Sequence, residues 1–173
     1  KSCYDLSGKV FVTAGLGGMS GAQPKACVIA GGICVVAEIN EKATVKRHQQ
    51  KWVDEIYNDL SKLFKRVEIA RKNKESISIA FQGNIVDCWE YIAANKIKIE
   101  LGSDQTSLHN PYSGGYYPVG LSFDESNEMI KNDPKKFKSK VQESLIRHVN
   151  AINKLTDKGM YFFDYGNAFL LES

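Results

Sequence analysis

The chain has 173 residues, of which 43% are hydrophobic, which is enough for one domain with a buried core. Its 23 Lys and Arg residues against 20 Asp and Glu residues give a formal net charge of +3. That charge is too small for the positive field of nucleic-acid-binding proteins, so no nucleic-acid partner is expected. No apolar run approaches 18 residues and no signal peptide opens the chain, so neither membrane insertion nor secretion is indicated.

The four cysteines contain no C-x-x-C pair. Cys27 and Cys34 lie in apolar segments, which is typical of reduced core residues in a cytoplasmic protein. The sequence does not begin with Met, and it ends directly after the apolar residues 169–171. We therefore expect residues 1–173 to be a single domain that is a segment of a longer chain.

Residues 10–38 predict a strand, a glycine-rich turn, a helix and a second strand. Residues 10–14 are apolar or β-branched, as in a central parallel strand that is buried on both faces. The turn at residues 15–21 contains four glycines, and Pro24 fits the first turn of a helix that is expected to stop at residues 31–32. A second apolar run then ends in Glu38, 23 positions after Gly15.

This arrangement is typical of a dinucleotide site. Glycines let backbone N–H groups approach a phosphate, and the helix N-terminus favours an anion. An acid about 20 residues further on can bind the ribose hydroxyls. Ser20 stands where the usual pattern has its third glycine, and a tightly packed structural turn is the alternative interpretation.

The next segments continue the alternation of helices and strands. A charged stretch at residues 41–51 is followed by apolar residues at helical spacing, which predict a helix over residues 53–67. The later elements expected up to residue 101 are a strand at 76–81, a corner at 82–84, a helix at 85–95 and a fourth strand at 97–101.

Residues 102–118 show neither helical nor strand periodicity and are rich in hydroxyls, amides and aromatic rings. A loop of this length is often functional, although a plain surface loop is the alternative. The remaining expected elements are a helix at 123–131, a long amphipathic helix through 141–152, a strand at 161–163 and a turn at 164–167. His48 and His148 are interpreted as ordinary helix residues, and the lysines at 131–140 as a solvated face.

The alternation predicts an α/β fold, namely a Rossmann-like, doubly wound, mainly parallel sheet with helices on both faces. The carboxyl ends of parallel strands meet at one edge, where such sheets bind ligands. The glycine turn, Glu38, residues 82–84, residues 104–105 and residues 164–165 are expected to converge there. No catalytic motif and no metal-binding motif is visible in the sequence.

Four blocks of this sequence resemble the urocanase family. They are Gly15-Leu16-Gly17-Gly18-Met19-Ser20-Gly21-Ala22-Gln23-Pro24, Gln105-Thr106-Ser107-Leu108-His109-Asn110-Pro111, Gly115-Tyr116-Tyr117-Pro118 and Phe163-Asp164-Tyr165-Gly166-Asn167. The resemblance covers essentially the whole chain and implies the central NAD-binding domain of a longer enzyme, urocanate hydratase.

The resemblance implies an activity in histidine degradation, in which water is added to urocanate to give imidazolonepropionate. It also implies tightly held NAD⁺ that acts as an electrophile, and a cytoplasmic homodimer. The family's cysteine-containing active-site segment and most urocanate-binding residues lie in a flanking domain, so this segment alone is expected to be inactive. The residues to which the resemblance assigns cofactor contacts are Gly18, Met19, Ser20, Glu38, Asn84, Ile85, Gln105, Thr106, Ser107, Leu108, His109, Tyr116, Tyr117 and Tyr165.

The chain departs from the family at one position, because bacterial members often have Arg five residues after the acid and this chain has Ala43. Lys42 or Lys46 is the expected substitute. Without the resemblance, the residues leave open a hydride-transferring dehydrogenase, a non-enzymatic nucleotide-binding module or a methyltransferase. The loop at residues 102–118 is expected to hold the nicotinamide half of NAD, because its amides and hydroxyls can pair with a neutral carboxamide.

Overall fold

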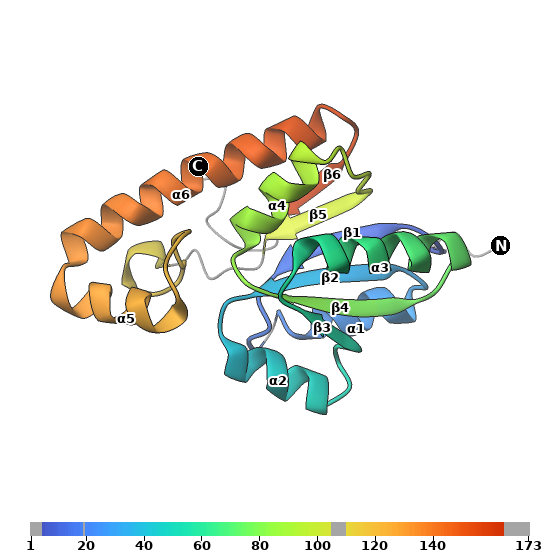
Figure 1. The fold of residues 1–173 in the computed structure, drawn as a ribbon, viewed down its shortest axis with the longest axis horizontal. Helices are drawn as coiled ribbons and strands as arrows, with labels where there is room; N and C mark the ends of the chain where they lie inside the picture. The colour runs from blue at the N-terminus through green and yellow to red at the C-terminus, as the bar shows by residue number, and fades with distance from the viewer. Residues whose placement is uncertain (1–4, 19, 105–109, 165–173) are drawn as a thin grey trace.

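The computed structural model describes residues 5–18, 20–104 and 110–164. Six parallel strands in these residues form one sheet with the order β3-β4-β2-β1-β5-β6 (Figure 1). The strands are β1 (Val10–Ala14), β2 (Ile33–Glu38), β3 (Glu55–Tyr57), β4 (Ile77–Gln82), β5 (Leu101–Asp104) and β6 (Tyr161–Asp164).

The helices lie on both faces of this sheet (Figure 1). They are α1 (Ala22–Ile29), α2 (Glu41–Gln49), α3 (Leu60–Asn73), α4 (Ile85–Ala94), α5 (Phe123–Asn132) and α6 (Pro134–Thr156), with a short 3₁₀ helix, η1 (Pro111–Ser113). Helices α1 and α2 join strands that move toward the β3 edge, whereas α3, α4 and α6 join strands that move toward β6. Right-handed crossovers therefore place the two groups on opposite faces.

Side chains alternate between the two faces along the central strands. Val12 and Val35 belong to the larger buried cluster, which includes residues of α3, α4 and α6. Phe11 and Val36 belong to a smaller cluster with Cys27 of α1. Because β1, β2 and β4 carry almost only apolar residues, they fit the centre of a sheet that is covered on both sides.

The predicted fold class is confirmed. Val12 pairs with Val35 in parallel register, and β1 and β2 have the expected bounds apart from the inclusion of Glu38 in β2. Helix α1 begins directly after Gly21, as the glycine turn predicts. The expected helices at 85–95 and 123–131 and the strand at 161–163 are present with shifts of one residue at their ends.

The predicted helix over residues 53–67 is wrong in its first half. Ile56 lies in the edge strand β3, and α3 begins only at Leu60, where the Asp59 carboxylate accepts a hydrogen bond from the Lys62 N–H at 2.8 Å. Val53 is buried in the smaller cluster without being helical. The spacing of these apolar residues matched a helix by coincidence, since a three-residue strand is too short to show its own period.

The predicted strand at 97–101 is also wrong, because β5 runs from Leu101 to Asp104. The side chains packed around β5 leave room only for a small residue at Gly102 and place a polar partner beside Ser103. A Cβ on Gly102 would lie 2.9 Å from the Trp89 ring, and the Ser103 hydroxyl lies 2.9 Å from the Thr13 hydroxyl. Residues 101–104 therefore belong to the sheet and not to the polar loop that was expected to begin at residue 102.

Within the ranges that the structure covers, no helix combines the length and the apolar character needed to cross a membrane.

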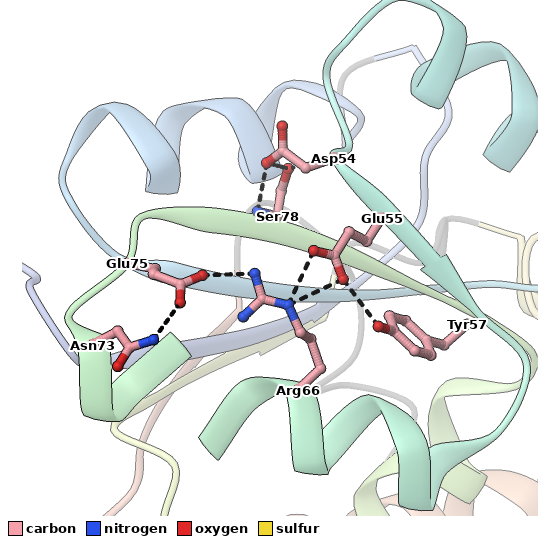
Figure 2. Close-up of polar contacts among 7 residues, drawn as sticks. All are labelled: Asp54, Glu55, Tyr57, Arg66, Asn73, Glu75 and Ser78. Carbon is pink, nitrogen blue, oxygen red and sulfur yellow. Dashed lines mark hydrogen bonds and ion pairs between the residues drawn. The ribbon is translucent and has the colours of Figure 1, made fainter. Parts of the chain in front are cut away.

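The short edge strand β3 is held by polar contacts to α3 and β4, as Figure 2 shows. Arg66 of α3 donates to both carboxylate oxygens of Glu55, at 3.0 and 3.2 Å, and to Glu75 at 2.6 Å. The Asp54 carboxylate accepts from the backbone N–H and the hydroxyl of Ser78, at 2.8 and 2.7 Å. These contacts compensate for the small number of ladder hydrogen bonds that three residues can make.

We expect Arg66→Met to lower the midpoint of thermal unfolding by about 2–4 °C, because it leaves two neighbouring carboxylates without their shared cation. Partial exposure of all three side chains limits the effect. Lys65→Met, at an exposed position of the same helix, is the control and should leave the midpoint unchanged. Equal midpoints for the two variants in a circular-dichroism melt would contradict a stabilising role for Arg66.

Candidate functional site

A pocket of about 220 Å³ lies at the carboxyl edge of the sheet. Four segments form its walls: the glycine turn of residues 15–21, the end of β2 around Glu38, the corner between β4 and α4, and residues 114–117. Three of these segments follow strands β1, β2 and β4, which are neighbours in the sheet. Parallel topology therefore brings them together although they are distant in sequence.

The glycine turn leaves β1 and leads directly into α1. Gly15 has φ of +91°, a backbone conformation that favours glycine, and its N–H donates to the Ala37 carbonyl at 2.8 Å. The Leu16 side chain is buried in the smaller core cluster and anchors the turn. At the end of β1, the Thr13 hydroxyl donates a hydrogen bond to the side-chain oxygen of Gln23 in α1 at 2.8 Å. The N-terminus of α1 is thus fixed beside the pocket.

Glu38, at the end of β2, binds the backbone of the glycine turn and of the residues that follow β2. One carboxylate oxygen accepts from the Leu16 N–H at 2.7 Å, and the other accepts from the Asn40 N–H at 2.8 Å. Each oxygen keeps a second lone pair, because a carboxylate offers about four acceptor positions. Glu38 can therefore hold the glycine turn and still accept hydrogen bonds from hydroxyl groups in the pocket.

Asn84 caps α4 and joins two walls of the pocket. Its side-chain oxygen accepts from the Val86 N–H at 2.9 Å, and its amide nitrogen donates to the Tyr117 carbonyl at 2.8 Å. Only 8% of Asn84 is exposed. The segment at residues 114–117 is therefore tied to the end of β4 through this one side chain.

Residues 114–117 begin with Gly114, whose φ is +94°, and then place Tyr116 in the core and Tyr117 at the pocket wall. Tyr117 is half-buried and stacks on Phe123 of α5, with ring centroids 5.1 Å apart. Burial raises the pKa of the Tyr116 hydroxyl well above its ordinary value, so this group stays protonated at neutral pH.

A buried polar chain continues behind Tyr116. The Tyr116 hydroxyl lies 3.3 Å from Nδ1 of His148 in α6, and Nε2 of His148 lies 3.4 Å from an Asp104 carboxylate oxygen at the end of β5. The side chains of His148 and Asp104 are both 0% exposed. Burial lowers the pKa of His148, and the neighbouring Asp104 opposes that shift. The lowered pKa favours the neutral form of His148 at pH 7, and this side chain lies between the pocket wall and the sheet.

The structure brings most of the described candidate residues together. Ser20, Glu38, Asn84, Ile85, Tyr116 and Tyr117 line the pocket. Gly18 is exposed in the glycine turn and lies outside the lining. The candidates outside the described residues are Met19, Gln105, Thr106, Ser107, Leu108, His109 and Tyr165.

Sequence reasoning missed two groups near this pocket. Arg47 of α2 donates to the carbonyl oxygens of the glycine turn, whereas Lys42 and Lys46, the expected cations, have exposed side chains. His148 was interpreted as an ordinary helix residue, yet it lies behind the pocket wall. A lone Arg on a charged helix and a lone His beside an apolar stripe carry no distinguishing sequence signal.

The part of the chain that the structure describes holds no group of three or more His, Cys, Asp or Glu side chains arranged for a metal ion. The pocket is instead lined by glycine backbone, one carboxylate, one amide, the Ser20 hydroxyl and two tyrosines, together with apolar residues such as Ile39 and Ile85. This arrangement can bind a diphosphate at the glycine turn and vicinal hydroxyls at Glu38.

The comparisons with known proteins agree with this geometry. The model of the family described as the urocanase Rossmann-like domain matches residues 1–173. A probable urocanate hydratase of Caenorhabditis elegans is 60% identical over 168 residues, which cover 96% of this chain and 25% of that protein. The urocanate hydratase of Homo sapiens is 52% identical over 174 residues, which cover 98% of this chain and 26% of that protein.

The chain thus spans about a quarter of the length of the curated relatives it matches. Among solved structures, a putative D-mannonate oxidoreductase from Haemophilus influenza with bound NAD has a TM-score of 0.48 and 10% identity. That similarity covers 93% of this chain and 55% of the oxidoreductase chain.

Proposed function

Because this chain belongs to the urocanase Rossmann-like domain family, we propose that it is the NAD-binding domain of a urocanate hydratase. Such an enzyme adds water to urocanate and gives imidazolonepropionate, a step of histidine degradation. The supporting observation is the pocket in which the glycine turn and Glu38 meet at the N-terminus of α1. When bound, NAD⁺ supplies an electrophile in this reaction and not a hydride acceptor.

The described residues support one orientation of NAD in the pocket. The backbone N–H of Gly17, which lines the pocket, and that of the adjacent Gly18, together with the N-terminus of α1, suit the diphosphate. Glu38 suits the hydroxyls of the adenosine ribose, since its oxygens retain free lone pairs. Asn84, Ile85 and Tyr117 then face the rest of the cofactor across the pocket.

The nicotinamide half is assigned to the segment that follows β5. We infer that Gln105, Thr106, Ser107, Leu108 and His109 contact it, with Tyr116 and Tyr165 nearby, as the family resemblance implies. Asp104, the residue before this segment, ends β5 at the carboxyl edge of the sheet, beside the buried His148. Met19 completes the proposed diphosphate contacts. The homodimeric state and the cytoplasmic location stay predictions.

The test is the identity of the nucleotide that the protein carries. We expect NAD⁺ to be released when the purified protein is denatured with acid and the supernatant is analysed by mass spectrometry. Protein that releases S-adenosylmethionine, or protein that releases no nucleotide and fails to bind added NAD⁺, would contradict the proposal.

The reaction itself is tested by the loss of urocanate absorbance. The full-length enzyme is expected to consume urocanate without net reduction of its NAD⁺, whereas residues 1–173 alone are expected to bind NAD⁺ without turnover. Steady formation of NADH by the full-length enzyme would favour the alternative, a hydride-transferring dehydrogenase.

A further inference from the structure

Arg47 makes an unusual set of contacts with the glycine turn. From α2, its guanidinium donates to the Leu16 carbonyl at 3.1 Å, to the Gly17 carbonyl and, at a longer 3.4 Å, to the Gly18 carbonyl. A fourth contact, from Nη1 to the Gln50 side-chain oxygen at 2.9 Å, keeps the group in place. One side chain therefore donates hydrogen bonds to three successive carbonyl oxygens of the turn.

Two neighbours of the Arg47 guanidinium fix its position. Its Cζ lies 4.5 Å from the centroid of the Trp52 ring, a cation–π contact that holds the guanidinium over the ring. On the other side is Gly21, where a Cβ atom would lie 2.4 Å from Nε and 2.8 Å from Cζ of Arg47. A Cβ on Gly21 would also lie 2.8 Å from the Gly17 carbonyl oxygen. Gly21 has φ of −61°, which any residue can adopt, so Arg47 and the backbone of the turn together account for glycine here.

The direction of these carbonyl groups sets the direction of the N–H groups. In a trans peptide the C=O of one residue and the N–H of the next point in opposite directions. Because Arg47 attracts the carbonyls of Leu16 and Gly17, the N–H groups of Gly17 and Gly18 point away from α2. Gly17 lines the pocket and Gly18 follows it in the turn, so these two N–H groups are the donors that we assign to a diphosphate in the pocket.

We propose that Arg47 is a positioning residue for the diphosphate of the cofactor, and that it acts through the backbone of the glycine turn. This inference rests on the proposed function of the pocket as an NAD site. The carboxylate of Glu38 accepts a hydrogen bond from the Leu16 N–H, and Arg47 donates to carbonyl oxygens of the same turn. The glycine turn is thereby fixed before the ligand binds, and the positive charge behind it also favours an anion.

The test compares ADP, which carries the diphosphate, with adenosine, which does not. In calorimetry on the purified protein freed of nucleotide, Arg47→Met is expected to weaken ADP and NAD⁺ binding roughly tenfold or more. Adenosine binding is expected to stay within about twofold, because its contacts do not use the Gly17 and Gly18 donors. Arg47→Lys should recover only part of the loss, since an ammonium cannot match the planar guanidinium fork.

Lys65→Met removes one charge from an exposed site on α3 and is the control for net charge. It should leave the affinities for ADP and for adenosine unchanged. Equal weakening of ADP and adenosine by Arg47→Met, or unchanged ADP binding, would overturn the positioning role alone. Loss of all ligands together with a lowered unfolding temperature would assign Arg47 to stability and also overturn it. If the wild-type protein binds neither NAD⁺ nor ADP, the proposed function fails as well.

Discussion

Glu38→Gln is expected to weaken NAD⁺ binding roughly tenfold and to reduce the preference for NAD⁺ over NADP⁺. The first effect arises because both carboxylate oxygens of Glu38 accept hydrogen bonds from backbone N–H groups, one from Leu16 and one from Asn40. The NH₂ group of a glutamine must face one of these donors and leave it unpaired. An unpaired buried donor costs about 1–3 kcal/mol, and here the cost includes a less ordered glycine turn.

The second effect arises from charge. A 2′-phosphate placed at the ribose position would lie beside the Glu38 carboxylate, and two like charges about 4 Å apart repel by about 4 kcal/mol in a partly screened site. The wild-type protein is therefore expected to bind NAD⁺ at least tenfold more tightly than NADP⁺, and the neutral side chain is expected to narrow this ratio.

The measurement is calorimetric titration of both dinucleotides, with Glu41→Gln as the matched control. Glu41 is an exposed acid in the first turn of α2 and lies outside the pocket lining, so its neutralisation should change neither affinity. A wild-type protein that binds NADP⁺ as tightly as NAD⁺ would refute the assignment of Glu38 to the ribose. An unchanged ratio in Glu38→Gln would refute it equally.

The sequence predicts the central part of this fold because local pattern and topology agree there. Residues 10–38 contain two apolar strands, a glycine turn and a helix start, and each of these signals depends on adjacent residues. The parallel direction of the strands then places Glu38 and Asn84 at one edge without further information. The pocket walls formed by these residues follow from the same argument.

The two strands that sequence reasoning misplaced depend on distant partners. Strand β3 is three residues long and is secured by Asp54 to Ser78 and by Glu55 to Arg66. Strand β5 buries Ser103 and Asp104, which an apolar pattern cannot reveal. These polar residues fit the sheet only because Thr13 and His148 lie opposite them in the folded chain.

The contacts of Arg47 with the glycine turn could not be predicted from the sequence either, because Arg47 is one of several cations in a helix of low hydrophobicity. Only the fold shows that Arg47, and neither Lys42 nor Lys46, reaches the turn carbonyls. Gly21 is the one local sign, because an additional glycine directly before a helix can indicate a close neighbour as well as a turn.

The stability of the domain is expected to fall as the pH is lowered below about 6.5, because His148 is buried in its neutral form. Burial lowers its pKa below the ordinary value of 6.5, and Asp104 opposes this only in part. Between the folded and the unfolded pKa, the unfolded chain binds the proton and the folded chain does not. The free energy of unfolding therefore decreases with falling pH in this window, by up to about 1.4 kcal/mol for each pH unit, and is unaffected by His148 above it.

Urea unfolding at several pH values measures this slope, and His148→Gln isolates it. The glutamine cannot titrate, so the variant is expected to lose the decrease below about pH 6.5, although it is less stable than the wild type at pH 7 because it disturbs the contacts to Tyr116 and Asp104. His48→Gln, at an exposed position of α2, should retain the wild-type slope. If His148→Gln keeps the full slope, the neutral buried His148 is not what limits stability in mild acid.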